Sequence, residues 1–358
     1  MEQLTPTLIE QQLNDLKAIG APVSQGTITA HKPGEQGANR LVLERWLPTW
    51  IRNSYINHRL FEKANSTEYL MASAKGLPAV IVGIGPSLDS DIEKLINYQK
   101  NCVIISTDAA LRPLTVKNIK PHIVVTVDAS QKQYTLFTGV DTQDIVLVAP
   151  TTTDPATLLA WQGPILLFNM AHPGLEFADI VLPSAFPQLR SICVHGTVGN
   201  TATLLAYQMG CKQIIAVGMD LCYGKRNDAW QYRCHDYFWH ASVSPEGDPQ
   251  YRWLQKECKE LYDNDLRVRD AYDVELKDKK FMVDAELELY RKSLFELVGS
   301  FTNVPFTNCS IDGILGAAGF YTQKFEDALA EHCSRQPYPG ESVALHLPKI
   351  LQRRDKND

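Results

Sequence analysis

Short apolar runs alternate with helix-like segments through the middle of the chain. Each run is nearly continuous in apolar residues, as expected for a strand buried on both faces of a parallel sheet. The six runs are AVIVG (79–83), CVIIST (102–107), HIVVTVD (122–128), DIVLVAP (144–150), PILLFNM (164–170) and QIIAVGMD (213–220). The segments with helical character are DSDIEKLINYQK (89–100), AALRPLTVKN (109–118), TDPATLLAWQ (153–162) and GNTATLLAYQMG (199–210). Strand alternating with helix predicts an α/β fold, a Rossmann-like, mostly parallel sheet flanked by helices.

Both flanks of this region show a different pattern. We expect a helical N-terminal extension over residues 1–76, the Rossmann-like domain over 77–320, and a C-terminal helix and tail over 321–358. In the extension, helices are predicted at 8–19 and 45–64, the second broken by Pro48, with a loop over 21–40 between them. The aromatic, polar stretch 223–249 predicts a long loop or lid. Further helices are predicted at 251–268, 285–301 and 322–334, and a short strand with a glycine-containing turn at 304–320.

Composition narrows the class of protein. Among 358 residues, 44% are hydrophobic and 21% charged, which is typical of a soluble globular protein. The net charge of −6 argues against a surface that coats nucleic acid. No apolar run approaches the ~18 residues of a membrane span, and the first residues lack the basic and apolar segments of a secretory signal. We therefore expect a cytoplasmic protein without a transmembrane segment, whose eight cysteines stay reduced.

The segment AVIVGIGPSLDSDI, residues 79–92, resembles a strand that enters a phosphate-binding turn. Outward N–H groups at a helix start favour a phosphate, and glycines permit its close approach. Pro86 suits the first helical position, although SDIE also predicts a helix start at Ser90. Leu88 replaces the third glycine of the dinucleotide fingerprint, and no Gly-Lys-Ser/Thr occurs, so a dehydrogenase or P-loop ATPase is disfavoured. A plain strand-to-helix turn is the alternative. The candidate phosphate-binding residues are Gly83, Gly85, Pro86 and Ser87.

Three aspartates follow predicted strands, namely Asp108, Asp128 and Asp220. Open α/β sheets bind ligands beyond the carboxyl ends of their strands. Carboxylates at these positions suit a ribose hydroxyl, a Mg²⁺ ion or the proton of an acceptor hydroxyl. Each aspartate alone is better explained as a cap or turn residue, whereas the three together favour function.

A second glycine-rich helix entry lies at VHGTVGNTATLLAYQMG, residues 194–210. Its polar residues, including Thr197 and Asn200, suit a second anion or sugar site. The alternative is a well-capped helix with Asn200 as its cap.

The histidines and cysteines of LCYGKRNDAWQYRCHDYFWH raise the question of zinc. Cys222, Cys234, His235 and His240 lack the paired spacing of a zinc site, so no metal site is predicted there. His240 or His235 is a candidate general base, because imidazole titrates near neutral pH.

Five motifs in order resemble one family. They are GIGPSL, VIISTDAALRPL, IKPHIVVTVD, GTVGNTATLLAYQMGCKQIIAVGMDLCY and NCSIDGILGAAGF. Over about residues 76–320 the chain resembles the 6-hydroxymethylpterin pyrophosphokinase-like (MptE-like) domain, which is also the centre of motility-associated-factor flagellin glycosyltransferases and is similar in fold to bacterial sialyltransferases. The resemblance implies that the turn at 83–87 lines nucleotide phosphates and that Asp108, Asp128, Thr197, Asn200 and Asp220 share its cleft.

Three functions follow from these observations. The first is a glycosyltransferase with a CMP-activated nonulosonic (sialic-acid-like) donor and a protein or glycan acceptor; its candidate catalytic residues are Asp220, His240 and Asp128. The second is an ATP-dependent pyrophosphokinase for a pterin alcohol, which needs Mg²⁺ held by acids such as Asp108 and Asp128. The third is a non-catalytic nucleotide-binding protein. A Lys/Arg cluster beside the glycine turn is absent from the sequence, which favours the first over the second.

Overall fold

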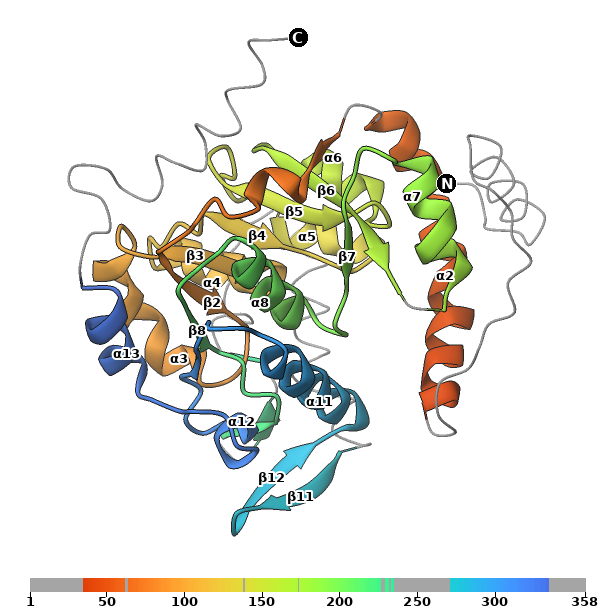
Figure 1. Ribbon diagram of the computed structural model, residues 1–358. Coiled ribbons are helices and arrows are strands. Elements are labelled where there is room, and N and C mark those ends of the chain that lie inside the picture. The colour runs from red at the N-terminus through yellow and green to blue at the C-terminus, as the bar shows by residue number, and fades with distance from the viewer. Residues whose placement is uncertain are drawn as a thin grey trace, which may run out of the picture. The chain divides into compact units, whose positions relative to one another are not determined.

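The computed structural model describes residues 35–61, 64–137, 139–172, 174–226, 229–231, 233–234 and 271–334. The chain divides into two compact units, each made of two separate stretches (Figure 1). The first unit comprises Met1–Tyr69 and Thr126–Val194, and the second comprises Leu70–Val125 and His195–Asp358. This division differs from boundaries at residues 76 and 320, because Thr126–Val194 groups with the N-terminal stretch.

The second unit is built on five parallel strands in the order β4-β3-β2-β8-β13. Every residue of these strands is buried. This explains why their sequences are nearly continuous in apolar residues. The predicted parallel α/β sheet is therefore confirmed. The bounds are β2 (Pro78–Val82), β3 (Val103–Thr107), β4 (Ile123–Val125), β8 (Gln213–Val217) and β13 (Phe306–Asn308).

Helical segments cover this sheet. One buried apolar cluster joins β2, β3 and β8 to the segment after β2 and to α13, whereas α8 contacts β2, β3, β4 and β8. The elements are α3 (Leu88–Asp91), a 3-10 helix (Ile92–Tyr98), a 3-10 turn (Asp108–Ala110), α4 (Leu111–Val116), α8 (Val198–Gln208), α11 (Ala285–Gly299), α12 (Ile314–Ala317) and α13 (Phe325–His332). The predicted helices at 285–301 and 322–334 are thus confirmed in α11 and α13.

The strand order places a topological switch at β2. The chain runs from β2 to β3 and β4 on one side, whereas β8 and β13 lie on the other side of β2. Ligands of open α/β folds bind at the carboxyl ends of the strands at such a switch. A ligand-binding site is therefore expected at the turns that follow β2 and β8.

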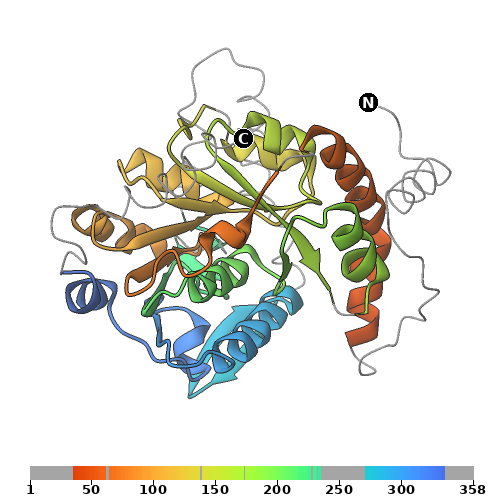
Figure 2. The same cartoon turned by 45° about the horizontal axis from the view of Figure 1, so that its top comes forward.

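Two antiparallel hairpins extend the second unit. The pairing of β9 (Gly224–Arg226) with β10 (Ala229–Gln231) replaces part of the loop predicted at 223–249. The second hairpin joins β11 (Tyr272–Leu276) to β12 (Lys279–Val283). Figure 2 shows it beside α11, and Val283 and Leu287 share a buried cluster there. The helix predicted at 251–268 lies outside the described residues.

The first unit carries parallel strands in the order β1-β6-β5, and β7 also pairs in parallel with β6. The strands are β1 (Asn65–Ser66), β5 (Val146–Pro150), β6 (Ile165–Ala171) and β7 (Ser191–Cys193). The helical segments are α2 (Glu35–Leu60), a 3-10 helix that begins in this unit (Thr67–Leu70), a 3-10 turn (Gln131–Gln133), α5 (Tyr134–Phe137), α6 (Pro155–Ala160), a π-helix (Phe177–Val181) and α7 (Leu182–Ala185).

Helix α2 differs from the prediction at two points. It begins at Glu35, inside the loop expected at 21–40, and it runs through Pro48 without interruption. A proline inside a helix removes one backbone hydrogen bond and costs about 3 kcal/mol or more. Tertiary contacts of α2 must offset that cost. The helix predicted at 8–19 lies outside the described residues.

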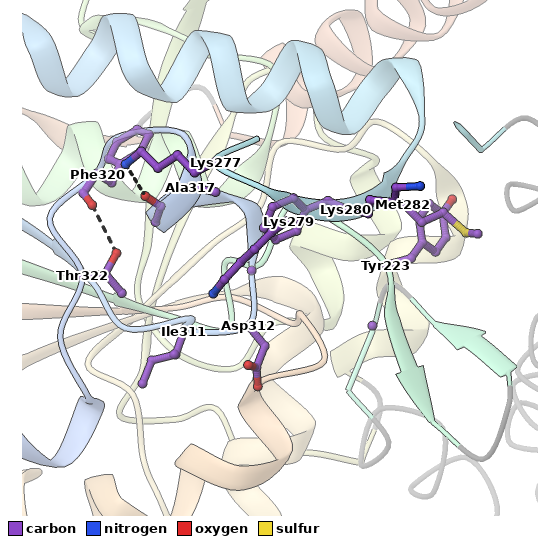
Figure 3. A pocket seen from close by; sticks show the side chains of 14 residues that line it. Tyr223, Lys277, Lys279, Lys280, Met282, Ile311, Asp312, Ala317, Phe320 and Thr322 are labelled. Atoms are coloured by element: carbon purple, nitrogen blue, oxygen red, sulfur yellow. Dashed lines mark hydrogen bonds between the residues drawn. The ribbon is translucent and has the colours of Figure 1, made fainter. Parts of the chain in front are cut away.

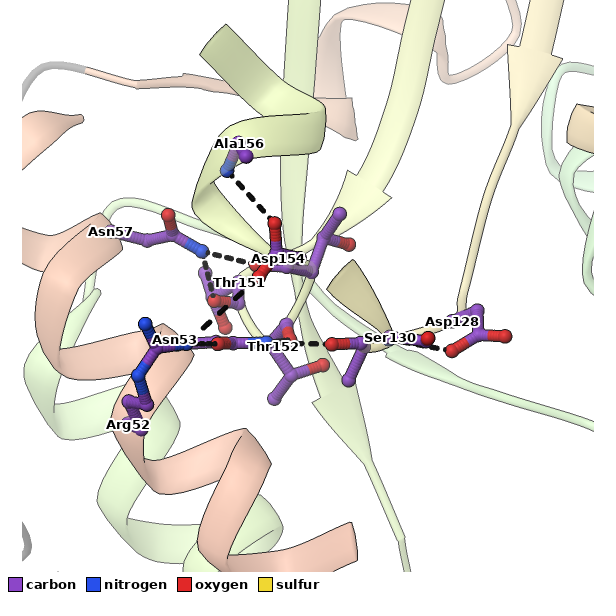
Figure 4. A network of polar contacts seen from close by, with 11 residues as sticks. Arg52, Asn53, Asn57, Asp128, Ser130, Thr151, Thr152, Asp154 and Ala156 are labelled. Atoms are coloured by element: carbon purple, nitrogen blue, oxygen red, sulfur yellow. Dashed lines mark hydrogen bonds and ion pairs between the residues drawn. The ribbon is translucent and has the colours of Figure 1, made fainter. Parts of the chain in front are cut away.

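Two buried asparagines supply such contacts (Figure 4). Each donates two hydrogen bonds from Nδ2 to backbone carbonyls of the first unit, at 2.7–3.0 Å. Asn53 binds the carbonyls of Ala129 and Thr152, and Asn57 binds those of Thr151 and Thr153. A buried hydrogen bond contributes about 0.5–1.5 kcal/mol, so four of them are comparable with the cost of Pro48. None of the helices in the described part of the chain combines the length and apolar character that crossing a membrane requires.

Candidate functional site

The turn after β2 is bound directly to the turn after β8. The N–H of Gly83 donates to Val217 O at 2.9 Å, and that of Gly85 donates to Gly218 O at 2.6 Å. A Cβ atom on either glycine would overlap the Gly218 carbonyl, and on Gly85 it would also overlap the Asp220 carboxylate. Glycine is therefore required at both positions for the contact between the two turns, before any ligand is considered.

The Asp220 carboxylate occupies an anion position on the first turn. Its Oδ2 accepts hydrogen bonds from Ser87 Oγ at 2.9 Å and from the Ser87 N–H at 3.3 Å. Only 4% of Asp220 is exposed. The turn predicted to hold a phosphate thus holds a negatively charged group of its own chain, and its donors do face an anion.

The helix after the turn begins at neither predicted position. Helix α3 starts at Leu88, so Pro86 lies in the turn and Ser90 lies inside the helix. The Ser87 side chain makes no capping bond because its hydroxyl donates to Asp220. Ser90 Oγ instead donates to the Ser87 carbonyl at 3.0 Å. The conformation of this turn is therefore determined by its contact with the turn after β8. The helix starts predicted at Pro86 and at Ser90 are both wrong.

Burial raises the pKa of the Asp220 carboxyl to about 7. The hydrogen bonds from Ser87 act in the opposite direction, and the nearby Asp312 carboxylate adds to the rise. A carboxyl with a pKa near 7 exists in both protonation states at neutral pH, which is the condition that suits an acid or base catalyst.

Asp108 and Asp128 differ in their surroundings. Asp108 directly follows β3, is 4% exposed, and accepts the Ala109 N–H on Oδ1 at 2.7 Å. Asp128 belongs to the first unit, where it accepts the Ser130 N–H at 2.7 Å (Figure 4) and Gln133 Nε2 at 2.9 Å. These contacts of Asp128 are those of a turn residue. Of the predicted acids, the structure brings Asp220 into contact with the glycine turn.

The second helix entry is organised by Asn200, although not as a cap. Thr197 holds the N-cap position of α8, without a side-chain cap bond. Asn200 lies inside α8 and is fully buried, and its Nδ2 donates to His195 O at 2.8 Å and Tyr290 O at 3.0 Å. The alternative of Asn200 as the cap is therefore wrong. Its Oδ1 has no hydrogen-bond partner among the described residues.

The loop after β13 completes the surroundings of Asp220, although none of its residues was among the predicted site residues. Ser310 Oγ accepts the Met219 N–H at 2.9 Å, and the Ile314 N–H donates to Asp220 O at 3.0 Å. A Cβ on Gly313 would lie 2.7 Å from the Asp220 Cα. The signal for this loop was the motif NCSIDGILGAAGF, in which Gly313 packs against the Asp220 backbone.

The histidines proposed as bases, His235 and His240, lie outside the described residues. Cys222 and Cys234 are buried, and burial raises the pKa of the Cys222 thiol to about 12. Within the described ranges, no group of three or more His, Cys, Asp or Glu side chains is arranged to hold a metal ion.

Comparisons with known proteins bear on the family and the fold of the chain. Residues 52–226 match the family model described as 6-hydroxymethylpterin diphosphokinase MptE-like. The fold is similar to that of the MAf glycosyltransferase from Magnetospirillum magneticum AMB-1, with a TM-score of 0.51 and 17% identity over 98% of this chain and 50% of that chain. The present chain thus spans half the length of that structure, and no curated protein matches it. The family match confirms the resemblance inferred from the motifs: residues 52–226 of the chain are similar to the MptE-like family.

Proposed function

We propose that this chain is a nucleotide-dependent transferase, namely a glycosyltransferase whose donor is a CMP-activated sugar of the nonulosonic class. The observation that carries the proposal is the pair of turns at the topological switch. There Ser87 presents an N–H and a hydroxyl to an anion, at the place where α/β folds bind nucleotides. The fold shared with a MAf glycosyltransferase supports sugar transfer as the reaction class.

In this proposal the donor phosphate binds the Gly83–Ser87 turn and shares it with Asp220. A second anion beside Asp220 raises the pKa of its carboxyl further, since like charges disfavour ionisation. Phosphate binding is therefore coupled to protonation of Asp220. The acceptor hydroxyl gives up its proton as it attacks the donor, while the phosphate is still bound. Asp220 in its ionised form is one candidate for the base that accepts this proton, and His240 is the other.

A second candidate is an ATP-dependent diphosphokinase. Its support is the printed description of the matching family, 6-hydroxymethylpterin diphosphokinase MptE-like. That reaction requires Mg²⁺ bridging the phosphates. Asp108 directly follows β3, which is parallel to β2, and is the candidate ligand for that ion.

Calorimetric titration separates the two candidates. CMP, CDP, ADP and ATP are titrated with and without Mg²⁺ into the wild type, into Ser87→Ala and into Ser90→Ala. Ser90→Ala is the matched control because it removes a hydroxyl that donates to the Ser87 carbonyl and does not face Asp220. We expect Mg²⁺-independent binding of CMP, weakened in Ser87→Ala and retained in Ser90→Ala.

Three outcomes would change this conclusion. Mg²⁺-dependent binding of ATP in preference to CMP would favour the diphosphokinase. CMP binding without release of CMP from a CMP-nonulosonic donor, in the presence of candidate protein or glycan acceptors, would favour a binding protein. Equal binding by the wild type and Ser87→Ala would remove the phosphate from this turn and contradict the proposal.

A further inference from the structure

A pocket of about 670 Å³ lies between the β11–β12 hairpin and the loop that follows β13, within the second unit (Figure 3). The volume falls in the range of small-molecule sites, which is roughly 300–1,000 Å³. Hairpin residues form one side, among them Lys277, Lys279 and Lys280. The opposite side includes Ile311, Asp312 and Phe320.

Lys279 is directed at the body of the protein by the register of the hairpin. Side chains alternate between the two faces of a strand, so Lys279 shares a face with the buried residues Phe281 and Val283. Its cross-strand partner is Leu276, which carries no charge. Figure 3 shows Lys279 extending from the hairpin toward the loop that carries Ile311 and Asp312.

Lys277 adds a second cation on the same side. It occupies the two-residue turn of the hairpin with φ of 50°, next to Asp278 with φ of 62°, the backbone of a type I′ turn. Its Nζ donates to Gly316 O at 3.4 Å, which holds the ammonium at the pocket. Among the described residues, neither Lys277 nor Lys279 forms an ion pair. Lys280 faces the oppositely charged Glu275 across the ladder.

The charges that line the pocket do not cancel. Lys277 and Lys279 stand against the single carboxylate of Asp312, an excess of one positive charge in a chain whose net charge is −6. An ammonium group binds phosphate as a compact point charge. A phosphate monoester carries nearly two negative charges at neutral pH, one for each of the two ammonium groups, whereas a carboxylate carries one.

We propose that this pocket binds the phosphate group of a small organic phosphate. The ammonium groups of Lys277 and Lys279 hold the phosphate, and the non-polar part of the molecule lies against Phe320 and Ile311. The site is separate from the Gly83–Ser87 turn. It adjoins that turn through Gly313, which lines the pocket and packs against the Asp220 backbone. The proposal does not depend on which nucleotide or sugar the first site takes.

Phenyl phosphate is a suitable probe because it joins a dianion to an aromatic ring, and benzoate is its carboxylate counterpart. Both are titrated into the wild type, Lys279→Gln, Lys277→Gln and Asp312→Asn by calorimetry at low ionic strength. Lys100→Gln is the matched control, an exposed lysine of the same unit distant in sequence from the pocket. Circular dichroism verifies that every variant is folded.

We expect phenyl phosphate to bind the wild type and Lys100→Gln equally. Each pocket lysine contributes a charged hydrogen bond of the kind whose loss weakens binding about tenfold or more. Asp312→Asn is expected to bind more tightly, since it removes the one opposing charge. Unchanged affinity in Lys279→Gln, no binding of phenyl phosphate at all, or equal affinity for benzoate would each overturn the proposal. Retained binding in Ser87→Ala is required for a separate site.

Discussion

Replacing Asp220 by asparagine tests whether the ionisation of this buried carboxyl lowers the free energy of unfolding. The carboxyl has a pKa of about 7 in the folded protein, against 3.8 for a free aspartate. Between these values the folded state holds more protons than the unfolded chain. The contribution of Asp220 to the free energy of unfolding of the wild type therefore falls as the pH rises through this window. Asparagine keeps the size and the acceptor oxygen of the side chain and removes the titration.

The magnitude follows from the difference of about three pKa units, each worth 1.36 kcal/mol. The wild type carries a penalty of roughly 4 kcal/mol at pH 8.5 and roughly 2 kcal/mol at pH 5 relative to the neutral side chain. Asp220→Asn is thus expected to be more stable than the wild type, and its advantage should grow by some 2–3 kcal/mol between pH 5 and pH 8.5.

Urea denaturation of both proteins at the two pH values measures this advantage. Glu326→Gln, an exposed carboxylate on α13, is the control and should follow the wild type. An advantage of Asp220→Asn that is the same at both pH values would refute the reasoning. It would mean that Asp220 titrates normally and that solvent reaches it.

Three further predictions concern other parts of the fold. Asn53→Ala removes two buried hydrogen bonds of α2 and should lower the free energy of unfolding by about 1–3 kcal/mol; an unchanged urea midpoint would contradict this. Burial lowers the pKa of His122 to about 4, and its Nδ1 accepts a backbone N–H of β3 at 3.0 Å. The neutral ring is needed for this bond, so the contribution of His122 to stability should fall as the pH drops from about 6.5 toward 4, and an NMR titration of the ring near 6.5 would disprove it. Gly85→Ala should destabilise strongly because its methyl group overlaps the neighbouring carboxylate, whereas Gly299→Ala meets open space and should not; thermal unfolding compares the two.

The strands were the most predictable part of the fold. A strand buried on both faces needs only apolar residues, so a run such as CVIIST is sufficient to identify β3. Helix boundaries were less predictable, because long-range contacts override local signals. Pro48 is tolerated inside α2, whose asparagines bind backbone groups about 76–99 residues away in sequence.

The sequence pointed to the two turns that form the candidate site. It did not predict which side chains of these turns contact each other. GIGPSL and GMD were both recognised, yet nothing in their local pattern indicates that Ser87 donates to Asp220. The direct partners of a side chain depend on strand order, which one sequence does not provide. For the same reason the aspartates at 108, 128 and 220 looked equivalent, although Asp128 belongs to the other unit.

The long sequence separation across the switch also bears on how the protein is made. Ala79 of β2 pairs with Ile214 of β8, 135 positions later (214 − 79), and Ser87 meets Asp220 across 133 positions. Domains dominated by such non-local pairings fold slowly, because loop closure precedes the contacts that reward it. During synthesis, the edge of β2 that pairs with β8 stays unpaired until β8 has left the ribosome. Formation of the Ser87–Asp220 contact during refolding would therefore be a late step, after the strands on the other side of β2 have paired.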